Sequence, residues 1–181
     1  MLPPATRREF FLRCANTPAA RRASALSAPR AGAGRRHVLS IDQDDARRQW
    51  DKSRSHFVEL LDLKLESVEK GRAVMRMPYR KQITNPTGAV HGGAIVALCD
   101  TCFYVALASI YGRDQDTTTV SLQCNYLAPA VAPHDLIAEA KVLRAGRRIC
   151  YGEVMVRSGE KLVAHTTLNF LNTYPNEKPK T

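Results

Sequence analysis

A long apolar segment with one charge near its middle most constrains how this chain can fold. The segment runs from Val90 to Tyr111, and between Ala94 and Ile110 its only charged residue is Asp100. A helix over this span is apolar on all faces, so we expect it to be buried on nearly every side. The run is shorter than a membrane span requires, and its central acid argues against stable membrane insertion.

The flanking segments predict one helix and six strands. Residues 42–61 begin with acids and favour a short amphipathic helix, which Trp50 and Phe57 would anchor to a sheet. Period-two alternation predicts two strands around the Lys70-Gly71 turn and four more within residues 117–129, 135–146, 147–159 and 161–172. Consecutive strands with short turns form an antiparallel meander. The predicted class is α+β, an antiparallel sheet wrapped around one long central helix.

The charge of the chain is concentrated at its start. The chain has 181 residues, 27 basic and 17 acidic, for a net charge of +10. Without the eight arginines and the one acid of residues 1–40, 19 basic and 16 acidic residues remain, a net charge of +3. The body therefore has no strongly basic surface with interleaved aromatics, and we expect no nucleic-acid partner.

Residues 1–40 are rich in Arg, Ala and Ser and nearly free of acids, which is typical of a mitochondrial transit peptide. This composition predicts delivery to the mitochondrial matrix. The alternative is a disordered basic tail on a cytoplasmic protein. We expect one folded domain over residues 41–174 and a short tail over 175–181.

The position of a carboxylate in the middle of an apolar helix requires an explanation. A carboxylate buried without partners costs several kcal/mol, so its retention favours a catalytic role. The structural alternative is that Asp100 reaches the surface at the flank of the helix or pairs with an arginine.

The start of the helix offers a complementary group. Gly92 and Gly93 lack side chains, and a helix N-terminus presents unpaired N–H donors that can stabilise an oxyanion. Close packing against a strand would explain the two glycines equally well. Asp100 follows Gly92 by eight residues, about 12 Å along the axis. If both groups act on one carbonyl, the acid must come from a second copy, which predicts an oligomer with the site at its interface.

The cysteines do not predict a redox or metal centre. The pair Cys99 and Cys102 has C-x-x-C spacing but lies deep within the helix, away from the N-terminus where a thiol pKa falls. Small core residues are the better interpretation. A zinc site would need two further ligands at suitable spacing, so we expect no metal and no cofactor.

The segment NPTGAVHGGAIVALCD, residues 85–100, resembles the motif of the hotdog-fold acyl-CoA thioesterases of the PaaI-like branch. The likeness continues through TVSLQCNYLAPA, the AGRR turn and KLVAHTTLNF, over about residues 55–172. The resemblance implies hydrolysis of acyl-CoA thioesters by a homodimer or homotetramer, with the acid and the glycine donors from different subunits.

The resemblance also implies a role for each matching residue. Asp100 would act as general base on water or as nucleophile on the thioester, and the Gly92 N–H would polarise the carbonyl beside Gly93. Asn85 and His91 would orient water or the leaving thiolate. Ser121, on the polar face of the next strand, would lie near Asp100 and help to place water.

Arginines near the last hairpins are candidates for contacts with the CoA phosphates. Arg147 and Arg148 follow the expected turn at Gly146, and Arg80, Lys81 and Arg113 are weaker candidates. Two other functions stay open. One is an acyl-CoA sensor that binds without turnover, and the other is a hotdog dehydratase that needs a paired His and acid. The intact set from Asn85 to Asp100 favours hydrolysis over both.

Overall fold

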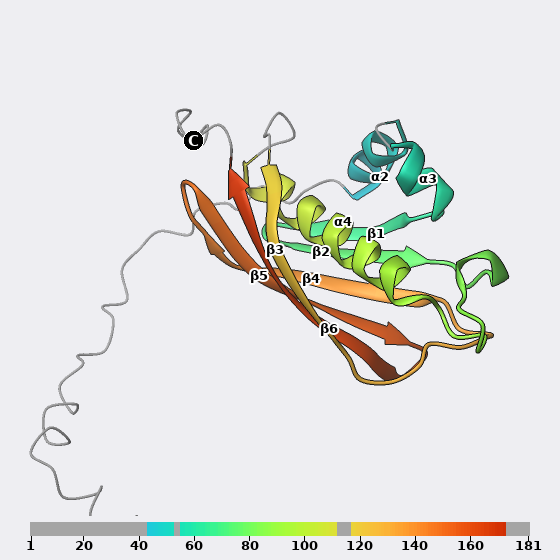
Figure 1. Ribbon diagram of the computed structural model, residues 1–181. Helices are drawn as coiled ribbons and strands as arrows, with labels where there is room; N and C mark the ends of the chain where they lie inside the picture. Colours follow the sequence, from blue (N-terminus) through green and yellow to red (C-terminus); the bar gives the residue numbers. More distant parts are fainter. Residues whose placement is uncertain (1–42, 53–54, 112–116, 173–181) are drawn as a thin grey trace, which may run out of the picture. The chain divides into compact units, whose positions relative to one another are not determined.

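The computed structural model describes residues 43–52, 55–111 and 117–172. The expectations for residues 1–40, for Arg113 and for the tail 175–181 lie outside these ranges. Figure 1 labels the elements: α2 (Gln43–Lys52), α3 (His56–Leu60), β1 (Lys64–Glu69), β2 (Arg72–Met77), the 3-10 helix η2 (Lys81–Ile83), α4 (Gly92–Tyr111), β3 (Thr117–Tyr126), β4 (Leu136–Ala145), β5 (Ile149–Ser158) and β6 (Lys161–Asn172).

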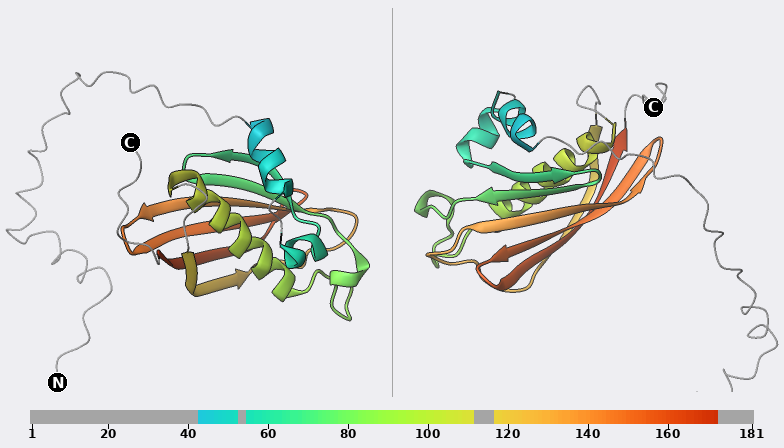
Figure 2. Two further views of the ribbon diagram at one scale, coloured as in Figure 1. Left: turned by 90° about the horizontal axis from the view of Figure 1, so that it is seen from above. Right: turned by 180° about the vertical axis from the view of Figure 1, so that it is seen from behind.

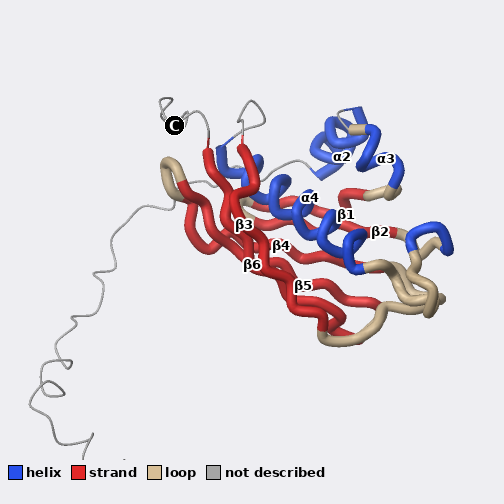
Figure 3. Tube along the Cα trace, in the orientation of Figure 1, coloured by secondary structure: helices blue, strands red, loops and turns tan. Residues whose placement is uncertain are grey.

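The strands form one six-stranded antiparallel sheet in the order β1-β2-β4-β5-β6-β3. α4 lies diagonally across one face of this sheet, as the view from above shows (Figure 2), and the helices gather on that side (Figure 3). Phe103 of α4 meets Phe170 of β6 edge to face, with ring centroids 5.1 Å apart. The predicted fold, an antiparallel sheet around one long helix, is confirmed, and it is the hotdog fold.

The neighbours of the strands differ from a simple meander. The hairpins β4–β5 and β5–β6 are present as predicted, but β3 pairs with β6, and β4 pairs with β2. The segment 127–135 carries Pro129 and Pro133 and does not join β3 and β4 as a hairpin. Leu127 N–H donates to the Val163 carbonyl at 2.9 Å, which holds the chain beside β6 before it crosses to β4. β3 therefore lies at one edge of the sheet.

α4 is buried on most of its surface but not on all of it. Its inner residues, Leu98, Cys99, Cys102 and Phe103 among them, are fully buried against the sheet. A second face, the uncovered face of α4, carries Gly93, Ala97, Asp100, Thr101 and Tyr104, which are half-buried or exposed. The expectation of burial on nearly every side is thus wrong for this face within one chain.

α4 also has 20 residues, so length and composition alone would let it cross a membrane. Its burial against the sheet identifies it as the core helix of the domain instead.

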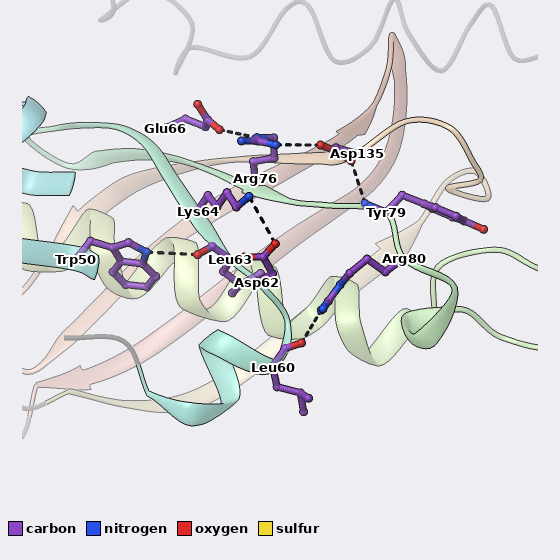
Figure 4. Close-up of polar contacts among 10 residues, drawn as sticks. All are labelled: Trp50, Leu60, Asp62, Leu63, Lys64, Glu66, Arg76, Tyr79, Arg80 and Asp135. Atoms are coloured by element: carbon purple, nitrogen blue, oxygen red, sulfur yellow. Dashed lines mark hydrogen bonds and ion pairs between the residues drawn. The ribbon is translucent and has the colours of Figure 1, made fainter. Parts of the chain in front are cut away.

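The opposite edge of the sheet, β1, is covered by α2. The side-chain amide of Gln43 donates to the Val68 carbonyl at 2.6 Å and accepts from the Val68 N–H at 2.8 Å. Arg47 donates to the carbonyl of Glu66, and the Trp50 indole donates to the carbonyl of Leu63 at 3.4 Å (Figure 4). These bonds satisfy edge groups that would otherwise be available for pairing with another strand.

The predicted single helix over 42–61 is two helices. Ser55 caps the second, because its hydroxyl accepts from the Val58 N–H at 3.4 Å. The new helix changes which residues face inward. Trp50 is 7% exposed, as expected of an anchor, whereas Phe57 is 57% exposed and is not one.

Candidate active site

Asn85 organises the loop that leads into α4. Its side-chain oxygen accepts hydrogen bonds from the Thr87 N–H at 3.0 Å, the Thr87 hydroxyl at 2.7 Å and the Ala89 N–H at 3.2 Å. The turn needs the left-handed conformation of Gly88, whose φ is +81°. Two backbone donors fix the orientation of the amide, so its NH₂ group is the part of Asn85 that can donate to a ligand.

His91 and the two glycines form the first turn of α4. The His91 carbonyl accepts from the Ala94 N–H at 2.9 Å, and its Nδ1 accepts from the Gly93 N–H at 2.9 Å. The Gly93 N–H is therefore occupied within the chain and is not a second open donor, and the place of Gly93 in substrate binding stays a prediction. Among the described residues, the Gly92 N–H has no acceptor. It remains available to a ligand at the positive end of the helix.

Tyr126, at the end of β3, lies directly against Gly92. Its hydroxyl donates to the Gly92 carbonyl at 3.0 Å. A Cβ added to Gly92 would lie 2.8 Å from this hydroxyl oxygen and 2.9 Å from Cζ of the ring. Close packing thus accounts for this glycine, and the free N–H provides a functional use of the same position. Tyr126 is not among the site residues predicted from the sequence.

Asp100 is held by Thr119. The Thr119 hydroxyl donates to Asp100 Oδ1 at 2.7 Å, and this bond fixes one carboxylate oxygen on the uncovered face of α4. Asp100 is half-buried and, among the described residues, makes no ion pair with an arginine. The carboxylate is consequently not neutralised by a structural partner.

Within one chain the hydroxyl that contacts Asp100 belongs to Thr119 rather than to Ser121, and a β-bulge puts Thr119 there. In the register of β3 with β6, Thr119 pairs with Phe170 and Ser121 pairs with Asn169, so Val120 is an extra residue. Directly opposite residues share a face of the sheet. Thr119 therefore lies on the inner face with buried Phe170, whereas the Ser121 hydroxyl accepts from Asn169 Nδ2 at 3.0 Å on the other face.

Strict alternation from Tyr126 back along β3 places Ser121 correctly on the outer face, but it puts Thr119 on that face as well. The bulge has no marker in the sequence, since Val120 is an ordinary strand residue. The only hint in the sequence is that Thr119, two positions before Ser121, also carries a hydroxyl that could bind Asp100.

The structure does not bring the predicted arginines to the start of α4. Arg147 and Arg148 lie exposed in the β4–β5 hairpin, where the Tyr111 hydroxyl at the end of α4 donates to the Gly146 carbonyl at 3.0 Å. Gly92 is at the other end of the same helix, about 28 Å away along the axis. Within one chain these arginines and Gly92 cannot contact the same part of a ligand.

The weaker candidates differ from one another. Arg80 donates to the Leu60 carbonyl and joins α3 to η2 (Figure 4), so its guanidinium has a structural use. Lys81 is exposed in η2.

The cysteine pair in α4 is buried in the core. Burial raises the pKa of Cys99 to about 12, and burial also raises the pKa of Cys102. Both thiols stay protonated at neutral pH and are poor redox nucleophiles, which supports their interpretation as core residues. Within the described ranges, no group of three His, Cys, Asp or Glu side chains is placed to hold a metal ion.

Comparisons with known proteins identify the family. A profile of the thioesterase superfamily matches residues 87–165, which include His91, Asp100 and Thr119. A putative esterase of Saccharolobus solfataricus is 31% identical over 109 residues, 60% of this chain and 76% of the relative. The acyl-coenzyme A thioesterase PaaI of Escherichia coli is 31% identical over 107 residues, 58% of this chain and 73% of the relative.

Solved structures agree with these relatives. A conserved protein of Pseudomonas aeruginosa has 34% identity and a TM-score of 0.64, and the match covers 67% of this chain and 97% of that protein. With its sheet, its central helix and these relatives, the chain is a hotdog-fold enzyme of the thioesterase superfamily.

Proposed function

We propose that this protein hydrolyses acyl-CoA thioesters to free acid and CoA. The strongest support for this proposal is that α4 presents two complementary catalytic groups, one near its middle and one at its N-terminus. One is the Asp100 carboxylate, held by Thr119 and not paired with a cation among the described residues. The other is the Gly92 N–H, free at the N-terminus of the helix. The relatives named as acyl-CoA thioesterase and as 1,4-dihydroxy-2-naphthoyl-CoA hydrolase point to the same substrate class.

Each group has a part in the reaction. The Gly92 N–H donates to the thioester oxygen as negative charge develops there. Asp100 removes a proton from water as the water attacks the carbonyl carbon, or attacks that carbon itself to form an acyl-aspartyl anhydride that water then hydrolyses. The thiolate of CoA then leaves with the electrons of the C–S bond. The Asn85 amide NH₂ and the His91 ring nitrogen opposite Nδ1 are left to orient water or the thiolate.

We also propose that the site forms between two copies of the chain. Gly92 and Asp100 are about 12 Å apart along one helix, which is too far for both to act on a single carbonyl. β3 is an edge strand of ten residues with exposed apolar side chains at Val120 and Tyr126. Such an edge favours pairing with another strand, whereas α2 covers the opposite edge of the sheet. Pairing of two β3 edges about a two-fold axis would bring the uncovered faces of two α4 helices together.

Turnover distinguishes the proposed enzyme from an acyl-CoA sensor. Incubation of the chain from Gln43 onward with a panel of acyl-CoAs should release free thiol, which a colorimetric thiol reagent detects. The chain is used from Gln43 because α2 belongs to the folded domain. Tight binding with no thiol release from any acyl-CoA would instead support the sensor.

The hydroxyl of Thr119 is expected to contribute directly to turnover. Thr119→Val keeps the shape of the side chain and removes the bond to Asp100. A hydrogen bond to a charged group contributes about 1.5–3 kcal/mol, so kcat should fall roughly ten- to a hundredfold. Thr119→Ser should retain most of the activity.

Ser121→Ala is the matched control, since it removes a hydroxyl from the same strand on the other face. We expect its kcat to stay within about twofold of wild type, because within the described ranges its hydroxyl bonds to Asn169 rather than to Asp100. A larger loss for Ser121→Ala than for Thr119→Val would contradict the register of β3.

Import into mitochondria by residues 1–40 stays a prediction from composition, and assembly of two dimers into a tetramer stays a prediction from the family resemblance.

A further inference from the structure

Tyr104 stands one helical turn beyond Asp100 on the uncovered face of α4. It is 38% exposed, although most residues around it on the helix are buried. Within the described part of the chain, its hydroxyl makes no hydrogen bond. Residues four apart on a helix have Cβ atoms roughly 5–6 Å from each other, so Tyr104 is a direct neighbour of the acid.

The surroundings of Asp100 are unequal along the helix. Side chains on a helix lean toward its N-terminus, so the ring of Tyr104 leans back toward the turn that carries Asp100. On the N-terminal side of the acid, the neighbouring residues of the helix are smaller: Val96, Ala97 and Gly93. Asp100 therefore has a bulky aromatic ring on one side and only smaller side chains of α4 on the other.

We propose that Tyr104 forms the end wall of the acyl subsite and limits the protein to short or compact acyl groups. The inference rests on the proposed thioesterase function. The two halves of an acyl-CoA leave the thioester in opposite directions, and only the acyl half gains from apolar contacts. Tyr104 is the largest exposed apolar side chain of α4, so the acyl half lies on its side, where a ring directed at the acid leaves little length for a linear chain.

The test is the chain-length profile of kcat/KM over straight-chain acyl-CoAs from butyryl to palmitoyl. Wild type should prefer the short end. Tyr104→Ala should move the preference to longer chains, with a gain of about fourfold in kcat/KM for each methylene that newly gains a buried contact. Tyr104→Trp should move the preference the other way, toward the shortest substrates.

Tyr151→Ala is the matched control, because Tyr151 is 37% exposed on β5 and lies in the register opposite Asn169, on the face away from α4. Its profile should be unchanged. Circular dichroism checks that each variant is folded, and Tyr104→Trp keeps the test open if the alanine variant does not fold.

The possible failures can be told apart. A wild-type protein that releases thiol from no acyl-CoA overturns the proposed function itself. A wild-type protein that works best on palmitoyl-CoA, or active Ala and Trp variants that keep the wild-type profile, overturn the inference about Tyr104 alone.

Discussion

Asp100→Asn is expected to lower kcat/KM for any acyl-CoA substrate by at least ~100-fold, the contribution typical of a general base. Asparagine has the same size and shape, and its side-chain oxygen can still accept from the Thr119 hydroxyl. The substitution therefore removes the negative charge and the basic oxygen with little change in packing. The rate of thiol release by purified protein, with substrate in excess, measures the effect.

Asp135→Asn is a control that should change stability rather than turnover. Asp135 accepts from Arg76 at 3.1 Å and from the Tyr79 N–H at 2.9 Å, so it has a structural role away from α4 (Figure 4). This variant should melt at a lower temperature and keep its turnover, whereas Asp100→Asn should keep its melting temperature and lose turnover. Full activity of Asp100→Asn would remove Asp100 from the reaction, whatever its position.

The element order was predictable because the local patterns are strong. One segment is long and apolar enough to fill a core, and the others alternate with a period of two, so a sheet covered by one helix is the arrangement that buries both. Strand neighbours were not predictable in the same way. The position of β3 beside β6 depends on the path of residues 127–135 across the end of the sheet, and no local pattern records that path.

In the candidate site, too, the residues with an unusual local pattern were predictable and the others were not. Asp100 and Gly92 could be found because a lone acid in an apolar helix and paired glycines at its start are unusual. Thr119 could not be distinguished from Ser121, because a single extra residue in β3 exchanges the faces of everything before it. The paired glycines predict two open donors, because a sequence does not show that the His91 ring turns back to accept the Gly93 N–H.

A second change of large effect tests the other half of the site, the Gly92 N–H. Gly92→Pro removes this donor, and proline is tolerated in the first turn of a helix. Loss of one oxyanion donor costs about 3 kcal/mol, so kcat should fall roughly a hundredfold or more. Gly92→Ala is the matched variant: it also adds a Cβ against the Tyr126 hydroxyl but keeps the N–H. It should lose far less activity, because the end of the exposed Tyr126 side chain can move aside.

Mixing two inactive variants then shows whether one chain or two make the site. Asp100→Asn and Gly92→Pro chains are unfolded together, refolded and assayed. If the acid and the donor come from different subunits, random pairing makes half of the dimers mixed, and each mixed dimer holds one intact site and one doubly defective site. About a quarter of wild-type activity should return for a two-fold symmetric dimer. If both groups act within one chain, every site lacks one of them and the mixture stays inactive, as each variant is alone.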